Sequence, residues 1–131
     1  DDPCSIGKCG GKCGDSRQGG RQCFSLPANT QFGLNALINS GITQTIKVFI
    51  DDKSVDTLTG NGVGNVNPGA KIYNSGSGKV CIEVWANGKM SPLRYADNPL
   101  DSKPGMAIIG TEDGSDNDYN DAIVILNWGL N

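Results

Sequence analysis

The sequence contains no histidine, and only 6% of its 131 residues are aromatic. Without histidine the chain lacks the usual proton shuttle of enzymes and one of the two main side chains that hold zinc. It also lacks any apolar run near the roughly 18 residues that a membrane-spanning helix needs, so we expect no membrane insertion. Few aromatic residues together with 19 glycines favour short strands joined by tight turns, and therefore an all-β fold.

The cysteines are numerous for a chain of this size and are unevenly placed. Four of the five fall within the first 23 residues, and the positions are Cys4, Cys9, Cys13, Cys23 and Cys81. Their gaps do not form the paired CxxC arms of a zinc site. We therefore expect disulfides and an oxidising compartment, either secreted or on the cell surface. The odd count leaves one thiol free or bridged to a second chain, and the pairing cannot be read from the sequence.

The composition divides the chain into two parts. Residues 1–22 are rich in glycine, cysteine and basic residues, with almost no apolar side chain beyond Ile6, so they cannot form a core of their own. Short disulfides could hold this extension compact, either as a small binding module or as a capping or linking segment. Residues 23–131 are long enough to form one domain with its own core.

From Cys23 onward, apolar and polar residues alternate in the way that is typical of half-buried strands. Strands are predicted at Phe24–Leu26, Phe32–Ile38, Thr45–Ile50, Ser54–Leu58, Lys71–Tyr73, Val80–Trp85, Met106–Thr111 and Ala122–Trp128. The turn dipeptide Asn87-Gly88 predicts a further strand after it. No segment has a capped pattern of helical period, and the turns recur at intervals typical of an antiparallel β-sandwich.

One loop, between the last two predicted strands, carries most of the negative charge. Its residues Glu112, Asp113, Asp116, Asp118 and Asp121 contribute −5 to a net charge of −3, so the rest of the chain sums to +2. A near-neutral body with one acidic spot does not suit nucleic acid, which needs a broad basic face. Carboxylates this close repel one another unless a cation neutralises them, and calcium prefers roughly six to eight such oxygen ligands. One calcium would leave −3 on the loop, so the charge favours two adjacent ions.

The spacing Asp116-x-Asp118-x-Asn120 resembles the opening of an EF-hand loop. An EF-hand is excluded because no glycine follows Asn120, the twelfth position is Asn127 where a glutamate is needed, and the flanks are strands rather than helices. A solvated acidic turn without metal and a purely structural calcium site both stay open as interpretations of the loop.

The acidic loop also resembles the signature of a known family. The block from Gly110 to Asp121, followed by Asn127-Trp128, is similar to that of the LecB type, small bacterial two-calcium lectins that bind fucose and mannose. The likeness extends over residues 24–131 and includes Leu26-Pro27-Ala28-Asn29-Thr30, Phe32-Gly33, Asn39-Ser40 and Asn74-Ser75-Gly76. It does not cover residues 1–22.

The resemblance implies a nine-stranded Greek-key sandwich and a site for two calcium ions that bind sugar hydroxyls directly. The implied calcium ligands are Asn39, Glu112, Asp116, Asp118, Asn120, Asp121 and the C-terminal carboxylate of Asn131 from a neighbouring subunit. The implied sugar contacts are Asn39, Ser40, Gly41, Asp113, Asp116, Asp118, Asp121 and Asn131. The expected partners are fucose- or mannose-containing glycans, and the expected assembly is a homodimer or a dimer of dimers joined through the C-terminus.

The choice of sugar is expected to depend on Ser40, Gly41 and Ile42. Ser40 resembles family members that favour fucose, whereas Ile42 is larger than expected and could either contact the sugar or point into the protein. A calcium-stabilised structural or adhesion module is the alternative function. A glycosidase is disfavoured, because calcium would hold carboxylates such as Asp113 and Asp116 ionised when one of them must carry a proton. We therefore predict a binding protein rather than an enzyme.

Overall fold

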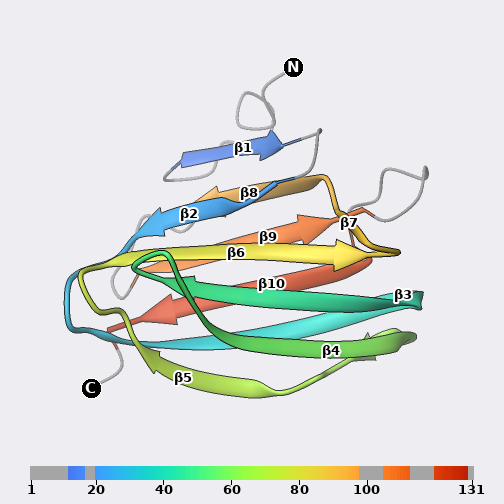
Figure 1. The fold of residues 1–131 in the computed structure, drawn as a ribbon, viewed down its shortest axis with the longest axis horizontal. Helices are drawn as coiled ribbons and strands as arrows, with labels where there is room; N and C mark the ends of the chain where they lie inside the picture. Colours follow the sequence, from blue (N-terminus) through green and yellow to red (C-terminus); the bar gives the residue numbers. More distant parts are fainter. Residues whose placement is uncertain (1–11, 17–19, 98–104, 113–119, 130–131) are drawn as a thin grey trace.

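The structure, a computed structural model, describes residues 12–16, 20–97, 105–112 and 120–129. These residues form ten strands joined by turns (Figure 1). Nothing in this part of the chain forms a helix long and apolar enough to cross a membrane. The strands are β1 Lys12–Ser16, β2 Gln22–Ser25, β3 Gln31–Ile50, β4 Lys53–Val66, β5 Ala70–Asn74, β6 Lys79–Ala86, β7 Lys89–Met90, β8 Leu93–Asp97, β9 Met106–Thr111 and β10 Ala122–Trp128.

The strands pair in the order β1-β8-β9-β10-β3-β6-β2, while β4 and β5 pair with β3, and β7 pairs with β6. All of these pairs are antiparallel, and neighbours such as β10 and β3 lie far apart in the sequence. Strands β2 to β10 are nine in number, so the prediction of an antiparallel nine-stranded all-β sandwich is confirmed.

Strand β3 connects the two layers of the sandwich. Its first half pairs with β10 and β5 between Gln31 and Ile38, and its second half pairs with β6 between Thr45 and Ile50. The sequence predicted two separate strands here, because residues 39–44 are polar or small except for Ile42 and break the apolar alternation. In the structure the backbone continues through this stretch, which places it at one end of the molecule (Figure 1).

The core is made of the apolar residues that alternate along the strands. Ile46 and Val48 on β3 face Val84 and Ile82 on β6, and all four are fully buried. The largest other apolar side chains without exposure are Phe32, Leu34, Ile38, Leu93, Ile109 and Leu126. Each of these buried side chains contributes roughly 1.5–3 kcal/mol of hydrophobic stabilisation, so the core holds the strand register on which the site depends.

A disulfide joins Cys23 on β2 to Cys81 on β6, at directly opposed positions of the two strands. The expectation of disulfides is therefore confirmed for this pair. Of the remaining cysteines Cys4, Cys9 and Cys13, at least one has no partner within the chain, because their number is odd. The bond fixes β2, an end strand of the sheet, to the body of the domain.

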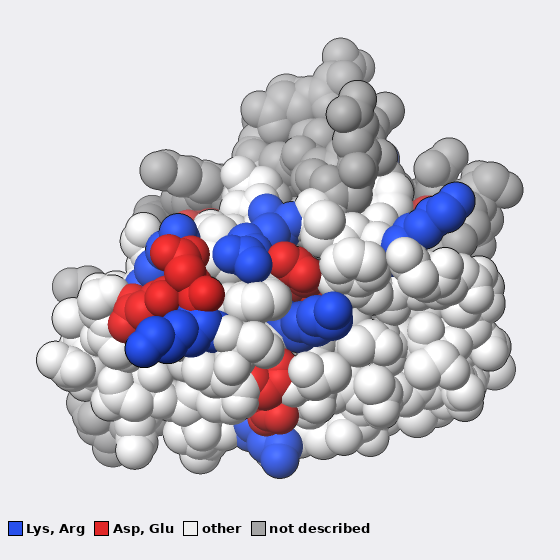
Figure 2. All heavy atoms as spheres, in the orientation of Figure 1, with Lys and Arg blue, Asp and Glu red and all other residues white. Residues whose placement is uncertain are grey.

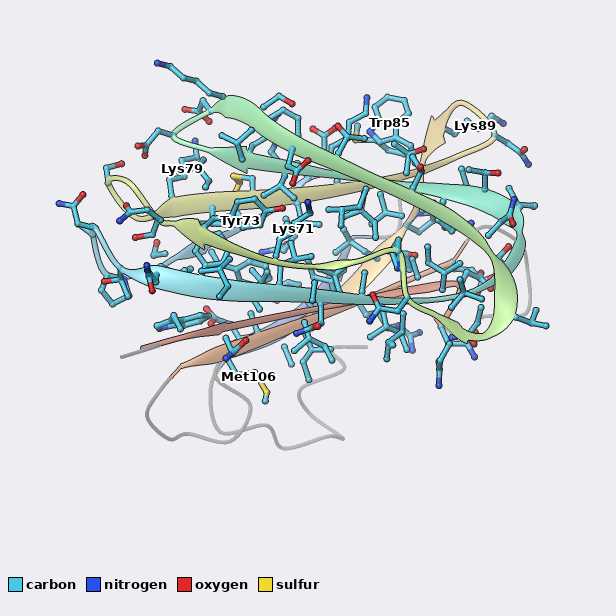
Figure 3. The ribbon with its side chains drawn as sticks, turned by 90° about the horizontal axis from the view of Figure 1, so that it is seen from below. Lys71, Tyr73, Lys79, Trp85, Lys89 and Met106 are labelled. Carbon is cyan, nitrogen blue, oxygen red and sulfur yellow. A yellow bond between two sulfur atoms is a disulfide. The ribbon has the colours of Figure 1, made fainter. Side chains whose placement is uncertain are left out.

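The outer face of β2, β6 and β3 carries charges of both signs (Figure 2). Arg21 bonds Glu83 at 3.0 Å, and Lys79 pairs with Asp52 at 2.8 Å. Lys79 and Trp85 lie toward opposite ends of β6, and Lys89 follows beyond the turn (Figure 3). The Lys79–Asp52 pair is exposed and contributes about 0–1 kcal/mol, whereas the Arg21–Glu83 pair is part-buried, because Glu83 is only 8% exposed.

Two strands were not predicted from the sequence: the one strand expected after Asn87-Gly88 is two strands, β7 and β8, and β1 lies in the extension. Residues Lys12–Ser16 form β1, which pairs with β8, whereas the sequence predicted only that the extension has no core of its own. The extension lacks the apolar alternation that predicts a strand. A strand can nevertheless join a sheet edge without this pattern, because the pairing uses backbone hydrogen bonds. The proposed division into residues 1–22 and 23–131 stays a prediction.

Candidate functional site

The acidic loop begins and ends on two paired strands. Thr111, the last residue of β9, lies opposite Ala122, the first residue of β10. Glu112 and Asp121 are therefore the first residues beyond the ladder on either side, and they are only 3% and 7% exposed. The Asp121 amide donates to the Thr111 carbonyl at 3.1 Å, and the Glu112 amide donates to the carbonyl of Pro92 at 3.1 Å. The register thus places two buried acidic residues at the two ends of the loop.

Strand β3 brings Asn39 to the same place. The Asn39 amide donates to the Asp121 carbonyl at 3.0 Å, one step beyond the pairing of Ile38 with Ala122. Its side-chain Nδ2 donates to the Asn120 carbonyl at 3.2 Å. Residues more than 80 positions apart are therefore adjacent, as the resemblance implied for Asn39, Asn120 and Asp121.

The Asn39 side chain is held from a second direction by β4. Its Oδ1 accepts the Asn65 amide at 2.7 Å and the Gly64 amide at 3.2 Å, and its Nδ2 also donates to Asn65 Oδ1 at 2.8 Å. Both Gly64 and Asn65 have left-handed backbone, with φ of 90° and 59°, so that their N–H groups converge on one oxygen. We call these four hydrogen bonds, including the one to Asn120, the Asn39 clamp.

The β3–β4 ladder is irregular beside this clamp. Between Ile38 and Ser40, β4 uses four residues where β3 uses two, and between Ser40 and Gln44 the excess lies on β3. Bulges bend a strand and redirect its side chains, and they are common next to functional sites. The residues expected to choose the sugar therefore occupy a segment with special geometry rather than a regular strand.

The three specificity residues differ in exposure. Ser40 is only 8% exposed, and its Oγ accepts the Ile42 amide at 3.0 Å. Gly41 is exposed, and a Cβ added there would have no neighbour within 4 Å. Ile42 is half-buried, so its side chain is neither wholly inside nor wholly free. The structure thus leaves open space above Gly41.

Several predicted site residues lie outside the described part of the chain. These are Asp113, Asp116, Asp118 and Asn131. Among the described residues, no three histidine, cysteine, aspartate or glutamate side chains are grouped to hold a metal ion. The donors that are described are carboxylate, amide and carbonyl oxygens, which is the chemistry of a hard cation such as calcium. Burial of two acidic residues beside one loop also favours a cation, because burial disfavours charged carboxylates that have no opposite charge near them.

Sequence reasoning missed Gly64, Asn65 and Pro92, which position the site through backbone or side-chain hydrogen bonds. Asn65 stands directly after a run of alternating glycines, Gly60 to Gly64, that looks like a simple turn. In the sequence, an asparagine beside a glycine run is a local signal, because asparagine tolerates the positive φ of 59° that it has here.

The oxygen donors of this β-sandwich lie together where its strands end. This arrangement is typical of a binding protein whose ligand site lies on loops. The chain belongs to the fucose-binding lectin II (PA-IIL) family, whose profile matches residues 24–130. This membership confirms the resemblance, and lectins bind carbohydrates without converting them, so the chain is not classed as an enzyme. No curated protein matches the chain significantly.

Solved structures of bacterial lectins resemble the chain closely. One is the Chromobacterium violaceum lectin CV2L in complex with α-methyl-fucoside, with a TM-score of 0.80, 45% identity, and coverage of 83% of this chain and 96% of that one. The Ralstonia solanacearum high-affinity mannose-binding lectin has a TM-score of 0.79, 47% identity and the same coverages of 83% and 96%. The C-terminal domain of the Burkholderia cenocepacia lectin BC2L-C has a TM-score of 0.77 and 42% identity, covering 88% and 99%.

Proposed function

We propose that this chain is a calcium-dependent lectin that binds fucose- or mannose-type sugars through two adjacent calcium ions. The observation that carries the proposal is the strand register, which gathers Glu112, Asp121, Asn120 and Asn39 at the two ends of the acidic loop. Family membership supports it, and so do the fucoside complex of one relative and the mannose-binding name of another.

The proposed calcium ligands are Glu112, Asp116, Asp118, Asn120, Asp121, Asn39 and the C-terminal carboxylate of Asn131 from a neighbouring subunit. When bound, the ions would offer exchangeable positions that vicinal sugar hydroxyls can fill. The carboxylates of Asp113, Asp116, Asp118 and Asp121 would accept the hydroxyl protons in short, charge-assisted hydrogen bonds.

The Asn39 clamp sharpens the part that Asn39 plays. Its side-chain oxygen already accepts two backbone amides, those of Asn65 and Gly64. A carbonyl-type oxygen has two lone pairs, so the side chain has no further acceptor site to offer a metal. The Asn39 ligand would therefore be its main-chain carbonyl oxygen, with the side chain serving to orient the backbone.

The proposed sugar contacts at the bulge are Ser40 and Gly41. A mild preference for fucose over mannose rests on Ser40, and the open space above Gly41 leaves room for a ring substituent beside it. The assembly proposed is a homodimer or a dimer of dimers, because the C-terminal carboxylate would enter a neighbour's site. The Cys23–Cys81 disulfide supports a secreted or surface location.

Titration calorimetry with methyl fucoside and methyl mannoside tests the function, in calcium and then in excess chelator. Binding is expected only with calcium, and Asp116→Ala or Asp118→Ala should abolish it. Asp56→Ala, a carboxylate change on β4 away from the acidic loop, is the matched control and should bind like the parent chain. Sugar binding that survives complete calcium removal would disprove the mechanism. If calcium raises the melting temperature and no monosaccharide raises it further, the chain is a structural calcium module instead.

A further inference from the structure

The extension supplies a strand to one edge of the sheet. Strand β8 pairs with β9 on one side and with β1 on the other (Figure 1). The family profile begins at residue 24, after β1 has ended, so β1 is an addition to the family domain. Without it, the sheet would end at β8, whose outer backbone groups would then have no strand beside them.

Strand β8 has the features of an edge that readily accepts a partner. Its five residues, Leu93–Asp97, pair with β9 in unbroken register, without a bulge that would twist the edge away. A proline inside the strand would block pairing because it has no backbone N–H, but Pro92 lies just before the strand. A regular edge of this kind is a template for another strand, and proteins usually cover or disrupt it.

The register of β1 on β8 matches residues of opposite charge. Lys12 is opposite Asp97, and Asp15 is opposite Arg94. Opposite charges at directly opposed positions of an antiparallel pair contribute roughly 0.2–1 kcal/mol each. The sequence of β1, Lys-Cys-Gly-Asp-Ser, has no large apolar residue, so backbone pairing and the charges at these two register positions are what can direct it to this edge.

The same edge is also complementary to itself. An antiparallel pair of two β8 strands centred between Tyr95 and Ala96 would place Arg94 of each copy opposite Asp97 of the other. A second copy of the chain could therefore provide the same two charge matches that β1 provides. The edge can accommodate only one of these two occupants at a time.

We propose that β1 is a built-in edge cover, which occupies β8 and thereby prevents two copies from pairing through their β8 strands. The extension then limits assembly to other surfaces, such as the C-terminal contact proposed above. This inference concerns β8 and does not rest on sugar binding.

The test reverses the two charges of β1 in the full chain and leaves the net charge unchanged. In Lys12→Glu/Asp15→Lys, both opposed pairs become like-charged, so β1 should leave β8. At a concentration low enough to keep the chains apart, hydrogen exchange of the β8 amides that face β1 should then accelerate at least tenfold. At higher concentration, sedimentation velocity should show a species of twice the parent's mass. Adding Arg94→Asp and Asp97→Lys restores opposite charges, and should restore both the slow exchange and the parent mass.

Two controls keep the outcome clear. Lys53→Glu, an exposed charge change at the start of β4, should leave exchange and mass unchanged. If the double variant proves unstable in a melting experiment, Asp15→Ala removes one charge match and should still accelerate β8 exchange. Unchanged β8 exchange in both variants would overturn the edge cover. Faster exchange with an unchanged mass would overturn the claim that β1 keeps a second copy away.

Discussion

At the scale of single residues, the site relies on asparagine as much as on carboxylates. Asn39 uses its amide N–H, its side-chain oxygen and its side-chain nitrogen on two segments, residues 120–121 and 64–65, which leaves its carbonyl as the candidate ligand. Such a role was not visible in the sequence. There Asn39 was identified only by family likeness, because a lone asparagine between two apolar strands has no spacing pattern of its own.

A second residue-scale feature, the bond between Tyr73 and Asp56, gives a prediction about pH. Tyr73 on β5 (Figure 3) donates its hydroxyl to Asp56 Oδ2 at 2.7 Å. This bond lowers the pKa of Asp56, while burial, and then the bond to Asp56, raises the pKa of Tyr73 above its ordinary value of 10.0. Tyr73→Phe should therefore lower the free energy of unfolding by about 1 kcal/mol at pH 7.

The directions of the two pKa shifts determine how the free energy of unfolding depends on pH. The stabilisation linked to Asp56 is present above its unfolded pKa of about 3.9, and disappears as the pH falls through the lowered folded value. The stabilisation linked to Tyr73 is present below a pH of about 10, and disappears as the pH rises toward the raised value. Urea unfolding should show the largest difference between the parent and Tyr73→Phe in the middle of this range. A double-mutant cycle with Asp56→Asn isolates the pair, and a difference independent of pH would contradict the assignment.

At the scale of elements, the β3–β4 irregularity makes the clamp possible. A regular ladder would pair each residue of β3 with one of β4, whereas the shifts on either side of Ser40 bring the amides of Gly64 and Asn65 onto one side chain. The clamp joins β4 to β3, and through Asn120 to the acidic loop. Strand β4 is therefore part of the site although none of its residues was expected there.

Substitutions at Asn65 test this role of β4. Asn65→Gly keeps the positive φ and the two backbone bonds but removes the acceptor for Asn39 Nδ2, which should weaken calcium binding about fivefold, equivalent to about 1 kcal/mol. Asn65→Ala also strains the backbone and should weaken it more. The control is Asn61→Ala, since Asn61 bonds Thr43 in the same segment without touching Asn39. Equal calcium affinities for Asn65→Gly and Asn61→Ala would argue against the clamp.

The elements also show how far the sequence could predict this molecule. Alternation correctly placed the strands around Val80–Trp85 and Ala122–Trp128, because their inward residues are continuously apolar. The alternation pattern divided β3 in two, because the middle residues of this strand are mostly polar. In the structure they lie at the irregular part of the β3–β4 ladder and in the Asn39 clamp rather than in the core. It missed β1, because pairing at a sheet edge requires a backbone and not an apolar pattern.

At the scale of the whole molecule, both ends of the strand order are fixed, one by a disulfide and the other by strand pairing. The Cys23–Cys81 disulfide holds β2 at one end, and β1 covers β8 at the other. Closing a loop of 58 residues stabilises the fold by roughly 3–5 kcal/mol in a chain-entropy account. With both edges closed as proposed, copies of the domain would associate through other surfaces, and the C-terminus is the surface that the proposed shared calcium site would use.

The C-terminal prediction concerns Asn131, which is expected to place its carboxylate in a neighbour's calcium site. Appending Gly-Ser after Asn131 moves that carboxylate away, and the loss of one charge-assisted ligand of about 1.5–3 kcal/mol should weaken sugar binding roughly tenfold or more. Asn131→Gly keeps a terminal carboxylate at the same position and should bind at least as tightly as the parent. If calorimetry finds undiminished affinity in the appended chain, the site is complete within one subunit. Parent-like affinity in Asn131→Gly together with loss in the appended chain would assign the effect to the carboxylate rather than to the side chain, and would make binding depend on the dimer.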